Sequence, residues 1–408
     1  MSTSTLYDLS PLARIMLMGV VIALGPLAWV WVRNQKASTS RRLRALTVLT
    51  LFLTFDLVIF GAFTRLTDSG LGCPDWPGCY GNASPVGAHA DIAAAQSAMP
   101  TGPVTHGKAW IEMVHRYLAT CVGVLILTLA VVSWVEHRRL RHAGGPGHAA
   151  PTVVSPWWPT WTLLWVCLQG AFGAWTVTMK LFPAIVTLHL IGGMVLLALL
   201  CVQATRYAQA DGGRQRQGIP AGLRTLMVVT FVLLGIQIAL GGWVSTNYAV
   251  LACNSFPMCQ GSWWPDMNFT QGFEFWRALG RLQDGSHIGF PALTAIHYVH
   301  RLMAYAVLAA MLWLAWRLHH ARVLPTQARW LAGLAFWQFA TGVSNVVFDW
   351  PLVAAVSHTA GAAALVVVLT WAVCASRRAT EVAAPASRAA TAGGASPASP
   401  LNVPRPFA

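Results

Sequence analysis

Residues 112–116 read EMVHR, and residues 297–301 read HYVHR. A second pair of motifs follows in the same order: QGAFG at 169–173 and QFATG at 338–342. Further matches are two cysteine pairs with five intervening residues, Cys73/Cys79 and Cys253/Cys259, and two histidines 20 residues after the glutamine of the second motif, His189 and His358. Four matches in one order predict two copies of one structural unit.

The composition indicates an integral membrane protein. Of 408 residues, 56% are hydrophobic and only 10% are charged, whereas a soluble protein carries roughly a quarter charged residues. The chain has 27 Lys and Arg against 13 Asp and Glu. In a soluble protein this excess would suggest nucleic acid binding. Here the basic residues flank apolar segments, which favours a role in membrane topology and not a nucleic acid partner.

Nine segments reach the length of about 20 apolar residues that a membrane-spanning helix needs. The first is followed by no small-residue cleavage site, so we expect it to be a retained helix. The predicted fold is therefore an all-α integral membrane protein, with spans at about 12–33, 45–65, 112–134, 157–179, 184–207, 222–246, 290–316, 327–348 and 351–375.

The basic residues predict the orientation of these spans. Nineteen of the 27 Lys and Arg residues lie in alternate connections and in the tail, all on one side. By the positive-inside rule that side is cytoplasmic, so the N-terminus and the long loops 66–111 and 247–289 face outward, and the C-terminus is cytoplasmic. No Arg/Ser-rich amphipathic presequence is apparent, which favours a bacterial inner (plasma) membrane.

The repeat predicts the domain organisation. Because each copy has four spans, both copies enter the membrane in one orientation, as parallel repeats. We expect an extra N-terminal transmembrane helix with a basic cytoplasmic loop, two four-helix units, and an Ala/Pro/Ser/Gly-rich disordered cytoplasmic tail. Their boundaries are 1–44, 45–207, 208–375 and 376–408.

Four histidines are the strongest functional signal. His115 and His189 lie in the first unit, and His300 and His358 lie in the second, each within about two turns of the start of its span. The four spans are predicted to run inward, so the imidazoles should lie at one depth near the outer surface. Two such pairs are typical of bis-histidine ligation of a planar macrocycle such as heme. Simple hydrogen bonding between helices is the alternative, and zinc fits less well because no tetrahedral ligand cluster accompanies them.

The two units differ beside the first histidine. Glu112 lies three residues before His115, and its counterpart is His297. A carboxylate in a low-dielectric site could act as a base, position water or stabilise positive charge; a hydrated surface carboxylate is the alternative. We infer that the first unit holds the macrocycle that reacts and the second a permanent one. His297 could itself be a ligand, although the alignment favours His300.

Two arginines and one aspartate within the predicted spans also call for an interpretation. Arg116 and Arg301 directly follow the first histidine of each unit. They could bind heme propionates, or extend to the membrane interface. Asp56 lies inside the second span and has Ile236 as its counterpart. We expect it to be a buried, hydrogen-bonded structural acid.

Several stretches together resemble the heme A synthases, over about residues 45–375. They are GAFTRLTDSGLGCPDWPGCYG (61–81), EMVHRYLA (112–119), TLHLIGG (187–193), CNSFPMC (253–259), IHYVHRL (296–302) and SHTAGAAAL (357–365). The resemblance implies a membrane oxidoreductase that converts the C8 methyl group of heme O to a formyl group, giving heme A for terminal cytochrome oxidases. The reaction implied is stepwise hydroxylation followed by loss of water. The family fold has eight spans, so this chain adds one at its start.

The resemblance also implies roles for the site residues. Heme O would lie between His115 and His189, with Arg116 nearby and Glu112 essential. Heme b would lie between His300 and His358, with Arg301 nearby, and would carry the electrons away. Residues 82–108 would cover the edge of the substrate. The expected partners are heme O, a heme O synthase, a membrane electron acceptor and the lipid bilayer; a homo-oligomer is compatible with this pattern.

The cysteine pairs would face an oxidising compartment, where disulfides persist. We expect bonds Cys73–Cys79 and Cys253–Cys259 that rigidify a lid over each macrocycle, with a redox role as the alternative. Three other functions compete with the preferred one. They are a diheme b-type cytochrome exchanging electrons with quinone, a heme transporter, and a quinone-linked thiol oxidase.

Overall fold

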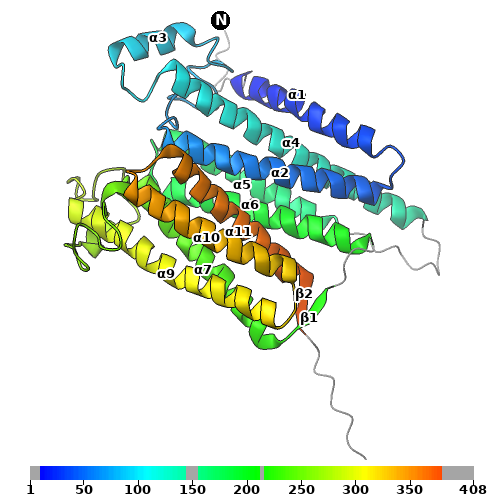
Figure 1. The fold of residues 1–408 in the computed structure, drawn as a ribbon. Helices are drawn as coiled ribbons and strands as arrows, with labels where there is room; N and C mark the ends of the chain where they lie inside the picture. Colours follow the sequence, from blue (N-terminus) through cyan, green and yellow to red (C-terminus); the bar gives the residue numbers. More distant parts are fainter. Residues whose placement is uncertain (1–9, 144–154, 212–215, 379–408) are drawn as a thin grey trace, which may run out of the picture.

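The structure, a computed structural model, describes residues 10–143, 155–211 and 216–378. Long helices run roughly parallel and antiparallel to one another (Figure 1). In the described residues nine of them coincide with the predicted spans. They are α1 (Ser10–Arg33), α2 (Thr39–Leu66), α4 (His106–Ala143), α5 (Trp157–Thr178), α6 (Pro183–Ala210), α7 (Ala221–Thr246), α9 (Phe290–His320), α10 (Pro325–Val347) and α11 (Leu352–Ala375).

Seven of these helices are long and apolar enough to cross a membrane, which confirms the predicted all-α membrane fold. Helices α5 and α10 are not among these seven; both contain tryptophan and polar side chains. They have 22 and 23 residues, enough to cross a hydrocarbon core of about 30 Å at a rise of about 1.5 Å per residue. Helix α5 packs against α4 and α6, and α10 packs against α9 and α11.

The remaining contacts build the bundle around these helices. Helix α2 packs against α4 and α6, while α7 packs against α9 and α11. Helix α6 contacts both α7 and α11, and α2 also contacts α11. The extra helix α1 lies along α4, where Gly19 meets Thr120 so closely that an added Cβ would overlap the threonine side chain.

The same tight turn joins the last two helices of each repeat. Lys180 and Leu181 between α5 and α6 have positive φ angles, and so do Asp349 and Trp350 between α10 and α11. Proline lies at the start of α6 and directly before α11. Proline fits there because the first turn of a helix leaves its N–H groups unpaired. This turn holds α5 beside α6 and α10 beside α11.

Both long connections lie at one end of the bundle, on the left of Figure 1. The first contains helix α3 (His89–Ala98), and the second contains the 3₁₀ turn η1 (Ala249–Leu251) and the short helix α8 (Phe269–Gly272). At the opposite end, strand β1 (Gln217–Ile219) pairs in parallel with strand β2 (Ser376–Arg378). None of these short elements is among those predicted from the sequence. Strand β2 also occupies the first residues of the segment expected to be disordered, and residues from 379 onward lie outside the described part.

Candidate functional site

All four predicted histidines line one cavity of about 880 Å³ among the helices. This volume is at the upper end of the range of about 300–1,000 Å³ that is usual for ligand pockets. Most of the wall is apolar, and it includes side chains from both repeats and from α1. Glu112, Arg116, His297 and Arg301 reach the same cavity. Together with the four histidines, these residues place a small number of polar groups in a concave, mostly apolar site, as expected for the binding site of a cofactor or substrate.

The histidines lie near the end of the bundle that carries the long connections. His189 and His358 are in the second turn of α6 and α11, whereas His115 and His300 are in the third turn of α4 and α9. The last two are therefore slightly deeper in their helices than predicted. Helix α4 explains part of this difference, because it begins at His106, before the predicted start at 112.

Each histidine ring lies against a glycine of the preceding long helix in its own repeat. A Cβ added at these glycines would lie only 3.0–3.5 Å from the Cε1 atom of the ring. The pairs are Gly61 with His115, Gly173 with His189, Gly241 with His300, and Gly342 with His358. We call these glycines the histidine seats. They bring two helices close to each imidazole and fix where the ring can lie.

The seats are not among the site residues predicted above, although the sequence contains a signal for them. Gly173 and Gly342 close the repeated motifs QGAFG and QFATG, and Gly61 and Gly241 have the same spacing as the two cysteine pairs. A glycine with no local turn to form indicates close approach of another group. In the first repeat Phe60 also stacks near His115, with ring centroids 6.2 Å apart and planes 14° apart.

Glu112 is buried, with 4% of its surface exposed. Its Oε1 lies 2.6 Å from the Nη2 atom of Arg116, and its Oε2 accepts a 2.8 Å hydrogen bond from the backbone N–H of Cys73. This burial does not fit a carboxylate hydrated at the membrane surface. Both oxygens therefore have partners within the protein, a guanidinium group and a backbone N–H.

Both expected disulfides, Cys73–Cys79 and Cys253–Cys259, are present. Each disulfide loop is held by the arginine of its own repeat. Arg116 donates to the carbonyl oxygens of Pro77 and Gly78. These contacts fix the first disulfide loop over the cavity, and Arg301 does the same for the second loop.

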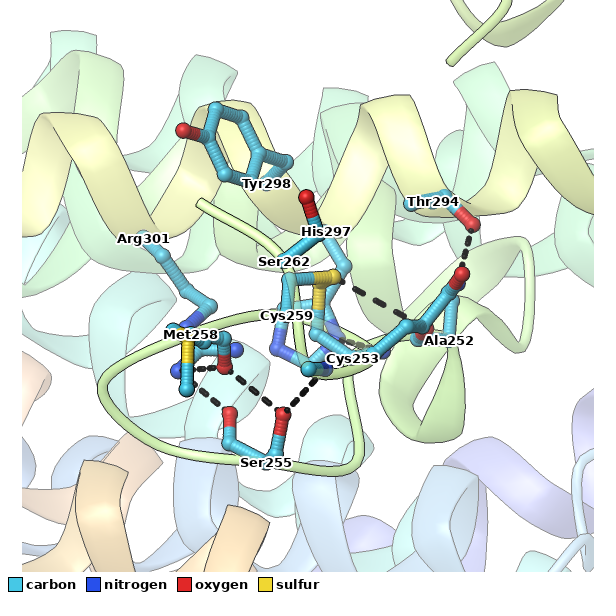
Figure 2. Close-up of a disulfide and its surroundings, with 12 residues drawn as sticks. Ala252, Cys253, Ser255, Met258, Cys259, Ser262, Thr294, His297, Tyr298 and Arg301 are labelled. Carbon is cyan, nitrogen blue, oxygen red and sulfur yellow. Dashed lines mark hydrogen bonds between the residues drawn. A yellow bond between two sulfur atoms is a disulfide. The ribbon is translucent and has the colours of Figure 1, made fainter. Parts of the chain in front are cut away.

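Figure 2 shows the loop of the second repeat. Arg301 donates to the carbonyl of Ser255 at 2.8 Å. Its Nη1 atom is buried and has no hydrogen-bond partner among the described residues, so it can still bind an anionic group. The backbone nitrogen of Cys253 lies 3.4 Å from Nδ1 of His297 (Figure 2). His297 thus occupies the place that Glu112 holds beside Cys73.

Two expectations need correction. The side chain of Asp56 is exposed on the outside of α2 and is not buried, because residue 56 is on a different face of the helix from the seat Gly61. In the first outer connection the cavity is lined by Gly70 and by Trp76 and Pro77 of the disulfide loop, and not by residues 82–108. Residues 82–108 pack against that loop and α4: Tyr117 donates to the carbonyl of Ala83 at 2.6 Å, and Ile92 lies in one buried cluster with the disulfide.

The residues present fit a heme-sized group. Each repeat offers two imidazoles from diagonally opposite helices of its four-helix unit, set on glycines and facing apolar walls. Each also offers an arginine at the cavity, and one guanidinium nitrogen in the second repeat is unpaired. Axial imidazoles, apolar surroundings and a cation for the propionates are what a heme requires.

Comparisons with known proteins agree with this geometry. The COX15-CtaA family model, described as "Cytochrome oxidase assembly protein", matches residues 44–370. A protein of Shewanella oneidensis named "Heme A synthase" is 37% identical over 326 residues, which cover 79% of this chain and 92% of that protein. Proteins of the same name from Chelativorans sp. and Shouchella clausii are 31% and 29% identical, and each alignment covers 75% of this chain. The alignments cover 83% and 87% of those two proteins.

Proposed function

The chain belongs to the heme A synthase family of cytochrome oxidase assembly proteins, and from this premise we propose that it oxidises the C8 methyl group of heme O to the formyl group of heme A. It is an oxidoreductase and a multi-pass membrane protein. The observation that carries the proposal is the buried carboxylate of Glu112. It reaches the cavity beside one histidine pair, while His297 stands in its place beside the other.

We assign the two histidine pairs to different groups. His115 and His189 hold the substrate heme O, with Arg116 and Glu112 at its edge. His300 and His358 hold heme b, and Arg301 lies nearby. When bound there, heme b supplies one-electron iron chemistry for passing electrons to a membrane acceptor. The seat Gly241 supports His300 as the ligand in preference to His297, whose Nδ1 lies beside the disulfide loop.

The domain organisation follows the same division. Residues 45–207 form the substrate unit, residues 208–375 form the heme b unit, and α1 with its basic loop is an addition to the first. The packing of α4 and α5 against α2 and α6, repeated by α9 and α10 against α7 and α11, supports this division. The basic connections face the cytoplasm of a bacterial cell, and both disulfide loops face outward.

The reaction converts a methyl group and one water molecule into a formyl group, and it releases four electrons and four protons. Two hydroxylations give a geminal diol, which then loses water. Glu112 acts on the substrate edge: its negative charge stabilises positive charge that develops at the methyl carbon. Arg116 and the Cys73 N–H hold both carboxylate oxygens in place. The apolar wall and the disulfide loop limit the access of bulk water to this position.

The proposal is tested by expressing the full chain in a host that makes heme O but lacks its own heme A synthase. Pigments extracted from the membranes should then contain heme A, and cells with the empty vector should contain none. A diheme electron carrier or a heme transporter would leave heme O unchanged. The proposed function would be contradicted if the membranes contained heme O but no heme A, although the protein purified from the same cells carried heme.

A further inference from the structure

The two histidine pairs differ in what their Nδ1 atoms contact. In the second repeat, the hydroxyl of Thr341 lies 2.9 Å from Nδ1 of His358, and the side-chain amide of Gln237 lies 3.1 Å from Nδ1 of His300. In the first repeat, the Nδ1 atoms of His115 and His189 are buried and have no hydrogen-bond partner in the described part of the chain.

The sequence accounts for this difference, because equivalent positions of the two repeats carry different residue types. Phe172 occupies the place of Thr341 in the repeated motifs QGAFG and QFATG, directly before the seat glycine of each. Leu57 occupies the place of Gln237, at the spacing that relates the two cysteine pairs. Two polar residues in one repeat therefore correspond to two apolar residues in the other, at positions on different helices.

Thr341 is suited to orient its histidine. Its hydroxyl donates to the carbonyl of Trp337 at 2.8 Å, so an oxygen lone pair remains to accept the Nδ1–H of His358. This leaves the Nε2 lone pair of the ring available to a metal. Gln237 holds its histidine in another way: its amide nitrogen donates to the backbone carbonyl of His300 at 3.2 Å and lies 3.1 Å from Nδ1 of the ring, so it fixes the position of that ring from α7.

Such a hydrogen bond strengthens a metal ligand. It fixes the tautomer and orientation of the ring and raises its basicity, and loss of the partner typically costs about 10- to 100-fold in metal affinity. Greater electron donation by the imidazole also stabilises ferric over ferrous iron, which lowers the reduction potential. The four residues thus give the two pairs unequal strength as axial ligands.

We propose that Gln237 and Thr341 are positioning residues that make the second site a retaining site for heme b, and that Leu57 and Phe172 leave the first site a weaker one from which the product heme can depart. The inference rests on the proposed function, in which one heme stays and the other is exchanged. A product destined for another protein must leave its site, so weaker ligation there serves turnover.

Thr341→Val removes the acceptor and keeps the shape of the side chain. In the purified full-length protein, we expect heme b to transfer to an excess of apomyoglobin about 10- to 100-fold faster than from the native protein. The reduction potential of heme b should rise, and Thr341→Ser should restore both properties. Thr230→Val is the matched control, because the Thr230 hydroxyl is also buried in a helix and bonded to a backbone carbonyl four residues earlier.

The reciprocal variant Phe172→Thr places an acceptor beside His189. We expect it to slow the transfer of heme O or heme A to apomyoglobin and to leave the heme b potential unchanged. Native retention and native potential in Thr341→Val, or unchanged release from Phe172→Thr, would overturn the inference. Both readouts are independent of heme A yield, so failure of the native chain to make heme A would count against the proposed function alone.

Discussion

Glu112→Gln is expected to lower heme A formation by about 100- to 1,000-fold while heme b stays bound. The substitution keeps the size of the side chain and an oxygen that can accept from the Cys73 N–H. It removes the negative charge that faces the cavity. Electrostatic groups aimed at developing charge typically contribute about 100- to 1,000-fold to the rate. We therefore expect the yield of heme A, measured in pigment extracts under limiting expression, to fall by about that factor.

The matched control for this variant is Glu136→Gln. Glu136 is on the same helix, α4, near its other end, and it does not line the cavity. The change of charge is identical, so heme A yield should remain native. Heme b content reports whether the Glu112 variant still folds, because loss of one partner of a buried ion pair can cost about 3–5 kcal/mol. A native yield of heme A from Glu112→Gln would contradict the assigned role.

Gly241→Val is expected to empty the heme b site. A Cβ at this position would lie 3.0 Å from Cε1 of His300, and 3.6 Å and 3.7 Å from its two nitrogens. The added side chain must displace the imidazole that would hold heme b. Overpacking of this kind costs about 1–3 kcal/mol, which a helical bundle can tolerate, whereas a metal–ligand distance tolerates only about 0.2 Å. Heme b per chain should fall at least tenfold.

Gly235→Val provides the control on the same helix, because a Cβ at Gly235 meets nothing within 4 Å. It should leave heme b content unchanged. Gly61→Val tests the other repeat: its Cβ would lie 3.0 Å from Cε1 of His115, so heme A yield should drop while heme b remains. Equal heme b content in Gly241→Val and Gly235→Val would show that the seat has no role in holding the ring.

The sequence predicted the bundle well because hydropathy and repetition act over long segments. Nine apolar runs correspond to nine helices, and the repeated motifs mark the four cavity histidines. The disulfides were also expected from their spacing and compartment, and both are confirmed. These features depend on the local chain or on matches between distant stretches, and a single sequence displays both.

Contacts between side chains on different helices could not be predicted, because a single sequence does not show which faces of two helices pack together. Asp56 was expected to be buried, but its direction around α2 decides its exposure. The seats and the Nδ1 contacts of Thr341 and Gln237 require knowledge of which helix faces which ring. Strands β1 and β2 have three residues each and join segments about 160 positions apart, so no local pattern could reveal them.

The central claim is that two separate histidine pairs, one in each repeat, hold two different hemes. Pigment content per chain, measured in purified variants that each lack one histidine, tests it most directly. We predict that His300→Ala and His358→Ala lose heme b, whereas His115→Ala and His189→Ala keep heme b and lose heme O and heme A. Retention of heme b in all four variants, or its loss in all four alike, would contradict the claim.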